Sequence, residues 1–301
     1  EHTLSNPKAD RMNLLRATRT QVSPVYSLYR PRGERIERIA GEPVIECEAD
    51  GQRHRVERAT GAPVDAFAAM IADADVYIAD GHHRYETALA YRDEVRARSS
   101  PWTGEEPENF VLMALTPYDD PGLLVLPTHR LVHLPSVPAD ALARVSRHFD
   151  AQPIDAGDVE AALARLGDAG TDTPAFIAAG LPGGPHLLTL RDRAAVEAMM
   201  PAEQLPAWKR LDVNVLQYGI LEAVFGIDDA ALKAGGAITY EQDAAAALDA
   251  VRRGSAQAAF LLNATPIAQV AAVADAGGRM PQKSTYFQPK LPTGLVLRPL
   301  D

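Results

Sequence analysis

The chain has 301 residues, 47% of them hydrophobic, which is enough for one large domain or two smaller ones with a sizeable core. Thirty Lys and Arg against forty Asp and Glu give a formal net charge of -10, so no overall basic field attracts nucleic acid or an anionic membrane. The single cysteine, Cys47, excludes an internal disulfide framework and a cysteine zinc site.

No apolar run approaches the ~20 residues that a membrane helix needs, and no signal-peptide pattern opens the chain, so we expect a soluble cytoplasmic protein. We therefore expect no contact with a membrane and, for this portion, no contact with nucleic acid. The oligomeric state is left open. Because the chain opens with "EHTLSNPKADR" and not with Met, we expect a further N-terminal segment in the natural protein.

The first part of the chain predicts two helices, a strand and a hairpin. Residues 10–21 have helical spacing, and the apolar run 25–29 is typical of a strand. Polar and apolar residues alternate through 33–60 around the turn "ADGQ", which predicts a hairpin. Residues 63–74 open with Pro and form an amphipathic helix. The strand 76–79 follows, and a further helix runs to about residue 98.

The rest of the chain predicts alternating strands and helices. Residues 110–117 and 123–130 are compact apolar runs of strand length, and we expect both to be buried. Residues 136–210 contain Ala-rich helices and a hairpin of two short strands, 175–180 and 186–190, which suits an inserted subdomain. The remaining ranges predict a helix ended by Gly226, followed by a βαβα series, at 211–226, 238–240, 243–254, 256–263 and 266–278.

The string "DGHHRYET" at residues 80–87 places polar residues where a strand becomes a helix. Asp80 can cap the helix, Gly81 permits a tight turn, and His82, His83 and Arg84 fall in the first turn. The unpaired N–H groups and the helix dipole favour an anion there, most naturally phosphate. Cations at this end oppose the dipole by about 0.3 to 1 kcal/mol each, so a bound anion would offset them.

A purely structural role for "DGHHR" is the alternative interpretation. Asp80 would then only cap the helix, one histidine would pack in the core, and Arg84 would pair with a nearby carboxylate. Adjacent histidines in a helix point about a quarter-turn apart and cannot share one ion, so we assign no metal site here, although one of them could still bind an ion together with distant partners.

Two other polar stretches could also bind phosphate. In "RMPQKSTYFQPK" (279–290), Lys283, Ser284 and Thr285 offer charge, hydroxyls and backbone donors, without the spacing of a Walker motif. In "LPTHRLV" (126–132), Arg130 follows a histidine within an apolar stretch, although a surface turn explains this string equally well. Thr265 of "NATP" is interpreted as a helix N-cap with Pro266 at the first helical position.

These strings together resemble a large bacterial family, the domain of unknown function 1015. The resemblance covers essentially the whole chain and rests on blocks such as "LSNPKADRMNLLRATRTQVSPVYSLY", "YIADGHHRYETALAY" and "MPQKSTYFQPKLPTGLV". Members usually carry a further segment before this start. "DGHHR" and "PQKST" are also similar to motifs of free L-serine kinases of the ParB/sulfiredoxin-like fold.

The resemblance implies a mixed α/β (α+β) fold in three parts. Residues 1–135 would form a ParB/sulfiredoxin-like core that carries "DGHHR". Residues 136–210 would be an inserted helix-rich α/β subdomain, which has no counterpart in the small kinases. Residues 211–301 would complete the core and bring the "PQKST" loop to residues 81–84, so that one anion bridges both loops.

The resemblance also implies roles for individual residues. Asp80, His83 and Arg84 are catalytic candidates, with Glu1 of "EHT" as the base that accepts the hydroxyl proton. The candidate phosphate- and nucleotide-binding residues are Gly81, His82, Arg130, Lys283, Ser284 and Thr285. The string "KSTYF" lacks the basic residue or histidine that the serine kinases tend to have after the threonine, so the substrate is left open.

The predicted activity is phosphoryl transfer from ATP or a related phosphate donor, with Mg²⁺, to a small hydroxyl compound, and free L-serine is the leading acceptor. The alternative is a non-catalytic nucleotide- or anion-binding regulator, since ParB-like folds also bind nucleotides as switches. A histidine-metal phosphohydrolase is a third possibility, and it predicts a bound transition metal.

Overall fold

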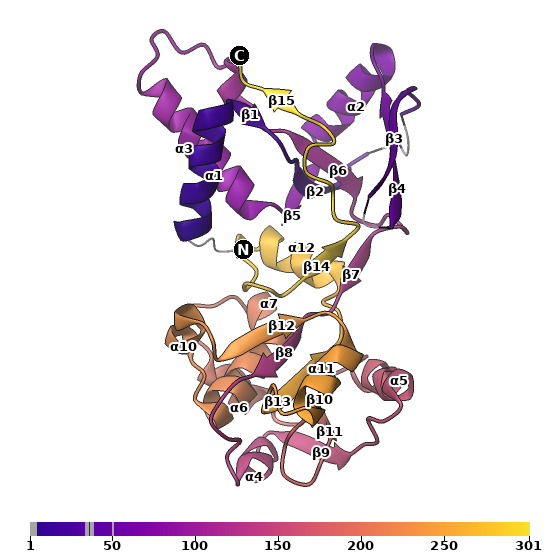
Figure 1. The fold of residues 1–301 in the computed structure, drawn as a ribbon, viewed down its shortest axis with the longest axis vertical. Coiled ribbons are helices and arrows are strands. Elements are labelled where there is room, and N and C mark those ends of the chain that lie inside the picture. The colour runs from indigo at the N-terminus through magenta and orange to yellow at the C-terminus, as the bar shows by residue number, and fades with distance from the viewer. Residues whose placement is uncertain (1–4, 34–35, 37–38, 50) are drawn as a thin grey trace. The chain divides into compact units, whose positions relative to one another are not determined.

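The computed structural model describes residues 5–33, 36, 39–49 and 51–301 of the chain. By its backbone contacts the chain divides into two compact units. We call Val125–Gln288 the central unit, and the sequence that flanks it, residues 5–124 and Pro289–Asp301, the outer unit. Both units mix helices and strands (Figure 1), which confirms the predicted α/β class. Among the described helices, none is long and apolar enough to cross a membrane.

The outer unit is built on a three-stranded sheet in the order β5-β2-β6. Strand β2 (Val25–Arg30) pairs antiparallel with β5 (Asp75–Asp80) and parallel with β6 (Met113–Pro117). The central strand β2 is almost completely buried, as its apolar sequence "VYSLYR" predicts. The short strands β1 (Thr20–Gln21) and β15 (Arg298–Pro299) form a separate antiparallel pair.

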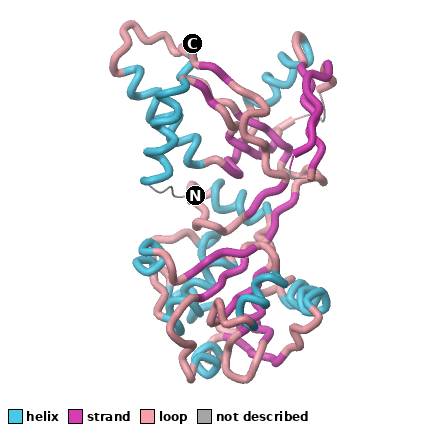
Figure 2. The backbone as a smooth tube through the Cα atoms, in the orientation of Figure 1, coloured by secondary structure: helices cyan, strands magenta, loops and turns pink. Residues whose placement is uncertain are grey.

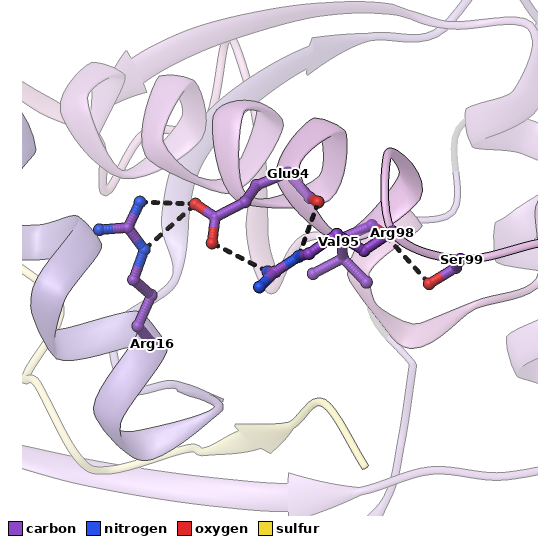
Figure 3. A network of polar contacts seen from close by, with 5 residues as sticks. All are labelled: Arg16, Glu94, Val95, Arg98 and Ser99. Carbon is purple, nitrogen blue, oxygen red and sulfur yellow. Dashed lines mark hydrogen bonds and ion pairs between the residues drawn. The ribbon is translucent and has the colours of Figure 1, made fainter.

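Two helices of the outer unit, α1 (Ser5–Thr18) and α3 (His82–Arg96), pack against each other. Leu15 of α1 and Tyr91 of α3 share a small apolar cluster with Leu300. At the exposed edge of this contact, Arg16 Nη2 lies 2.5 Å from Glu94 Oε2, and Arg98 binds the other oxygen of Glu94 (Figure 3). The α1–α3 pair therefore combines apolar packing with a polar network near its ends.

The remaining elements of the outer unit confirm most of the sequence predictions. The predicted hairpin is formed by β3 (Glu42–Ala49) and β4 (Gln52–Arg58). Helix α2 (Ala62–Ala72) begins with a proline in its first turn and contacts β2 through an edge-on pair of Phe67 and Tyr29, with ring centroids 5.9 Å apart. A short 3-10 helix, η1 (Pro107–Asn109), precedes β6.

The central unit is a six-stranded sheet covered by helices on both faces (Figure 2). All neighbouring strands are antiparallel, in the order β12-β8-β13-β10-β11-β9. These strands are β8 (His129–Val132), β9 (Phe149–Pro153), β10 (Ala175–Ala179), β11 (His186–Leu190), β12 (Ile238–Glu241) and β13 (Ala258–Leu262).

Alternation along each strand separates the two cores of this sheet. Phe176 and Phe260 face the larger core, whereas their neighbours Ile177 and Leu261 face the smaller one. The smaller core is closed by α5 (Val159–Ala169) and α11 (Ala244–Arg252). The larger core is closed mainly by α4 (Ala141–Val145), α6 (Arg193–Met199), α7 (Pro206–Lys209), α8 (Asp212–Leu216), η2 (Gln217–Glu222), α9 (Ala223–Phe225) and α12 (Ile267–Asp275).

Aspartates fix where several helices of the central unit begin. Asp158, Asp192, Asp228 and Asp243 each accept a hydrogen bond from the backbone N–H three residues later. These residues begin α5, α6, α10 (Asp229–Ala234) and α11. Each carboxylate accepts a hydrogen bond from an N–H group that the helix leaves unpaired. The position of the aspartate therefore sets the residue at which each helix begins.

Three predictions about elements need correction. Residues 123–130 form two short strands, β7 (Leu124–Leu126) and β8, because Pro127 has no N–H for a ladder. Both runs were expected to be buried, but Phe110 of the first and Leu124 of the second are exposed. Strand β9 was missed, since "FDAQP" is an edge strand with polar residues. The 211–226 helix does end at left-handed Gly226, but a π-helical segment, η2, interrupts it.

The predicted βαβα series is present as β12, α11, β13 and α12, with one difference in pairing. Strand β8 lies between β12 and β13 and is antiparallel to both. Strands of the predicted 136–210 subdomain, β9, β10 and β11, belong to the same sheet as strands from both flanking segments. The three-part division of the chain stays a prediction, and the compact unit that contains this sheet is Val125–Gln288.

Replacing Phe260 by alanine is expected to lower the unfolding free energy of the central unit by about 3 to 5 kcal/mol, because the ring leaves a cavity in a packed core. Phe260 is fully buried and its ring lies 5.7 Å from that of Phe225. Phe110→Ala is the matched control, because its side chain is 46% exposed. Urea denaturation measures both; equal losses for the two variants would contradict the assigned core.

Candidate functional site

The "DGHHR" string lies in the outer unit, where β5 ends at Asp80 and α3 begins at His82. Gly81 between them has φ 94° and ψ 24°, in the left-handed region that glycine adopts without the steric cost of a side chain. It serves as the N-cap, and its carbonyl accepts the first helical hydrogen bond from Tyr85 N–H at 2.9 Å. The predicted tight turn is therefore present.

The prediction that the Asp80 carboxylate caps α3 is wrong, because no side chain caps this helix. Asp80 Oδ2 lies 3.7 Å from Arg84 Nη2 and 3.5 Å from Lys290 Nζ. Two cations thus lie near one carboxylate oxygen. With Asp80 and Lys290 about 40% exposed, such long contacts are weak, and a stronger anion can compete for the two cations.

Arg84 folds back onto the start of its own helix. A Cβ atom placed on Gly81 would lie 2.7 Å from Arg84 Nη2 and 2.8 Å from Nε. The side chain is mostly buried, and Nε has no hydrogen-bond partner within the described structure. Burial lowers the pKa of Arg84 from its ordinary high value; Asp80 opposes the change and Arg11 adds to it. The absence of a side chain on Gly81 is what lets the guanidinium reach this position.

His82 of the motif differs from a simple cation. Burial lowers the pKa of His82 to about 4, so this side chain is neutral at neutral pH. His83 is half-buried in the first turn of α3. A neutral His82 removes one of the three charges that would oppose the helix dipole, and Arg84 remains the fixed positive group of this turn.

The "PQKST" string lies in the central unit and forms a loop held by buried polar groups. Ser284 is 3% exposed and donates through Oγ to the Pro281 carbonyl at 2.6 Å. Thr265 Oγ1 donates to the Ser284 carbonyl at 2.9 Å, and Arg130 Nη2 donates to the Lys283 carbonyl at 3.1 Å. Three sequence-distant strings therefore meet in one loop cluster.

This cluster changes the interpretation of two residues. The prediction that Thr265 caps α12 is wrong. Pro266 is the N-cap, and the Thr265 hydroxyl donates to the Ser284 carbonyl of the loop instead. Arg130 is buried, donates to the carbonyl groups of Thr128 and Lys283, and stacks on Tyr240 with its guanidinium carbon 5.4 Å from the ring centroid. In this structure Arg130 supports the loop that presents Lys283.

Lys283 is the exposed cation of this loop. Its φ of 57° is left-handed, which is uncommon for a residue with a side chain and costs about 1 to 2 kcal/mol. The hydrogen bonds from Arg130 and Thr265 to adjacent carbonyls hold the backbone in this conformation. Strain that the surroundings maintain is typical of functional loops, and Thr285, half-buried, lies beside it.

His129, next to Arg130, has a structural role. It is 1% exposed and its Nδ1 accepts a hydrogen bond from the Leu262 N–H at 3.2 Å, which requires an unprotonated Nδ1. Burial, together with the nearby charge of Arg130, lowers the pKa of His129 to about 4. The residue therefore joins β8 to the end of β13 as a neutral side chain.

The structure brings some predicted site residues together and leaves others apart. Asp80, Gly81, His82, His83 and Arg84 form one cluster in the outer unit, whereas Arg130, Lys283, Ser284 and Thr285 form another in the central unit. That both clusters bind one anion stays a prediction. Glu1, the predicted base, lies outside the described residues. In the described part of the chain, no group of three or more His, Cys, Asp or Glu is arranged to hold a metal ion.

Sequence reasoning missed Lys290 as a partner of Asp80 and Thr265 as a support of the loop. Lys290 lies 210 residues from Asp80, and no local pattern links the two. A signal for Thr265 did exist: it follows the end of β13, and Arg130 lies near the start of β8. Because β8 and β13 are antiparallel neighbours, these strand ends lie at the same edge of the sheet.

The chain belongs to the family described as "Protein of unknown function (DUF1015)", whose sequence pattern matches residues 1–214. The match includes "DGHHR" and "LPTHR" and ends before the loop at 281–285. No curated protein matches the chain.

Several solved structures are similar in fold. A conserved hypothetical protein from Pyrococcus furiosus has 12% identity and a TM-score of 0.45, over 97% of this chain and 87% of that one. A free serine kinase in complex with AMP has 10% identity and a TM-score of 0.47, over 95% of this chain and 81% of that one. A mutant free serine kinase in complex with ADP has 12% identity and a TM-score of 0.44, with 95% and 81% covered.

Gly81→Ala is expected to destabilise the protein by more than Gly104→Ala. Both glycines have left-handed φ, 94° and 97°, so alanine costs backbone strain of about 1 to 2 kcal/mol at each. Only at Gly81 does the new methyl also push against Arg84, since Gly104 has open space around it. Thermal denaturation compares the two variants. Equal destabilisation would show that Arg84 does not rest on Gly81 in solution.

His129→Asn is expected to make stability less sensitive to acid. The folded pKa of about 4 lies below the ordinary 6.5, so the unfolded chain binds the proton first as the pH falls. Stability that is full above pH 6.5 is therefore lost progressively toward pH 4, by on the order of 3 kcal/mol for this residue. Asparagine keeps an acceptor for Leu262 N–H without titrating.

The measurement is the unfolding free energy in urea at pH 7.5 and at pH 4.5, for both proteins. The pH 7.5 difference reports the change in packing alone. A wild-type loss on acidification no larger than that of the variant would contradict the role given to His129.

Proposed function

We propose that this protein is a phosphotransferase that moves the γ-phosphoryl group of ATP to a small hydroxyl compound, with free L-serine as the leading acceptor. The observation that carries the proposal is the start of α3, where Arg84 and Lys290 surround Asp80 beside a glycine-capped helix N-terminus. Phosphoryl transfer depends mainly on positioning and charge neutralisation, and this turn supplies fixed cations and backbone donors.

Each cluster has a part in the proposed reaction. The N–H groups at the start of α3 and the guanidinium of Arg84 bind phosphate oxygens, which replace Asp80 as the partners of the two cations. The strained Lys283 loop offers an exposed ammonium group, and Thr285 a hydroxyl, for phosphate or substrate. The resemblance of "DGHHR" and "PQKST" to the motifs of free L-serine kinases supports both assignments.

The bonds in the proposed step balance without a further reactant. The acceptor oxygen forms a bond to the γ-phosphorus, and the bond from that phosphorus to the bridging oxygen breaks, leaving ADP. The hydroxyl proton passes to a carboxylate, for which Glu1 is our candidate from the motif resemblance.

Mg²⁺ would reduce the charge repulsion between ATP and the attacking oxygen. It is usually held by one or two carboxylates together with phosphates and waters, so Asp80 alone would suffice on the protein side. The half-exposed carboxylate of Asp80 fits this role once phosphate takes over its two cations. His83 is the candidate for orienting water or substrate in the same turn.

A nucleotide- or anion-binding regulator is the second candidate. The observation that favours it is that Asp80 already neutralises part of the charge on Arg84 and Lys290. An anion that displaces Asp80 would change the contacts of the α3 start and of the 289–301 segment without any reaction.

Incubation of the protein with ATP, Mg²⁺ and L-serine is expected to give phosphoserine and ADP in equal amounts. Arg84→Ala should reduce turnover roughly 100-fold to 1,000-fold, as for the loss of one charge-stabilising donor. Lys283→Gly should also reduce it, because glycine keeps the left-handed backbone and removes only the ammonium group. Arg92→Ala is the matched control on α3, since Arg92 pairs with its neighbour Asp93.

The products separate the two candidates. Calorimetric binding of ATP without any ADP or phosphoserine formed from a panel of small hydroxyl compounds would identify a regulator. Equal turnover in wild type and Arg84→Ala would contradict the role given to Arg84 and therefore the proposed site.

A further inference from the structure

Tyr240 is an exposed aromatic residue on β12, the strand at one edge of the central sheet (Figure 1). It is paired across the sheet with Arg130 on β8, and Arg130 is paired in turn with Phe260 on β13. Paired residues of neighbouring strands project from the same face of a sheet. Tyr240 therefore lies at the edge of the row that Phe260 begins in the larger core, and it is 36% exposed there.

Arg130 connects this tyrosine to the Lys283 loop. Its guanidinium carbon lies over the Tyr240 ring, 5.4 Å from the centroid, and its Nη2 donates to the Lys283 carbonyl at 3.1 Å. Arg130 is buried, and its Nη1 donates to the Thr128 carbonyl, so two backbone groups hold the guanidinium in place. One planar group therefore contacts both an exposed aromatic ring and the backbone of an exposed lysine.

The charges beside Tyr240 and at Lys283 have opposite signs. Glu241 follows the tyrosine, and its Oε1 accepts hydrogen bonds from the N–H groups of Gln242 and Asp243. The Asp243 carboxylate in turn caps α11. Two fixed carboxylates near Tyr240 repel phosphate, whereas the ammonium group of Lys283 attracts it. A ligand with a flat uncharged end and an anionic end fits this arrangement, and a nucleotide has both.

We propose that the exposed ring of Tyr240 stacks on the base of a purine nucleotide whose phosphates are bound at Lys283. This inference rests on the proposed function, which assigns the Lys283 loop to phosphate. Arg130 occupies one face of the ring and fixes its orientation, and the base takes the other face. Stacking tolerates different bases because every base has a π-face, so Tyr240 does not distinguish adenine from guanine.

The test is calorimetric titration of the whole protein with ATP, GTP, CTP and inorganic tripolyphosphate, in Mg²⁺ and without an acceptor. The wild type is expected to bind ATP and GTP about tenfold more tightly than tripolyphosphate, which has the charge without a base, and CTP in between. Tyr240→Leu should weaken ATP binding about tenfold and leave tripolyphosphate binding unchanged. Tyr240→Phe keeps the ring and should bind ATP like the wild type.

Phe110→Leu is the matched control. Phe110 is 46% exposed and also lies under an arginine, with the guanidinium carbon of Arg298 5.9 Å from its ring centroid. Arg298 donates to the carbonyls of Pro107 and Phe110, so this pair lies apart from the Lys283 loop. Phe110→Leu should leave the binding of ATP and of tripolyphosphate unchanged.

The pattern of losses decides the proposal. Equal weakening of ATP and tripolyphosphate by Tyr240→Leu would show that the ring acts only through Arg130 and the loop, and it would overturn the stack. Equal effects of Tyr240→Leu and Phe110→Leu would also overturn it. Phosphoserine formation is measured separately: turnover without a preference for ATP over tripolyphosphate refutes the stack alone, whereas a preference that Tyr240→Leu removes, without turnover, refutes the phosphotransferase alone.

Discussion

The packing of the Arg84 guanidinium on the backbone of Gly81 is the contact on which the chemistry of the outer unit depends. A left-handed residue without Cβ ends β5 and begins α3, and the space that the missing side chain leaves is filled by the guanidinium. The same side chain then faces Asp80 through Nη2. One backbone constraint therefore fixes a mostly buried positive charge at the start of α3.

In the central unit, buried polar side chains hold Lys283 in an unfavourable left-handed conformation. Arg130 and Thr265 donate hydrogen bonds to the carbonyls of Lys283 and Ser284, and the Ser284 hydroxyl donates to the Pro281 carbonyl. Each of these groups is satisfied inside the protein, so the loop keeps its shape without a ligand. The side chain of Lys283 is exposed on this loop.

Much of the fold could be predicted from local patterns. The apolar strand 25–30 and the hairpin around Gly51 follow from periodicity and turn chemistry. The edge strand β9 and the division at Pro127 were not predicted, because an edge strand needs no apolar alternation and a proline inside an apolar run can end a strand or merely border it. The order β12-β8-β13 was also beyond local patterns, since strand pairing depends on contacts between residues far apart in sequence.

The sequence by itself determined that "DGHHR" is a strand-to-helix turn with glycine at its centre, because only that residue type tolerates φ near 94° at no cost. It also determined that residues 283–285 offer a cation and two hydroxyl groups without the spacing of a Walker motif. Tertiary structure decided which polar atoms are left to bind a ligand. Asp80 lies near two cations and does not cap α3. Arg130 and Thr265 donate to the carbonyls of the 281–285 loop, and the Thr87 hydroxyl has no partner in the described structure. The physical reason is that hydrogen-bond satisfaction is settled by distance in space, and partners such as Lys290 and Asp80 are separated by 210 residues of chain.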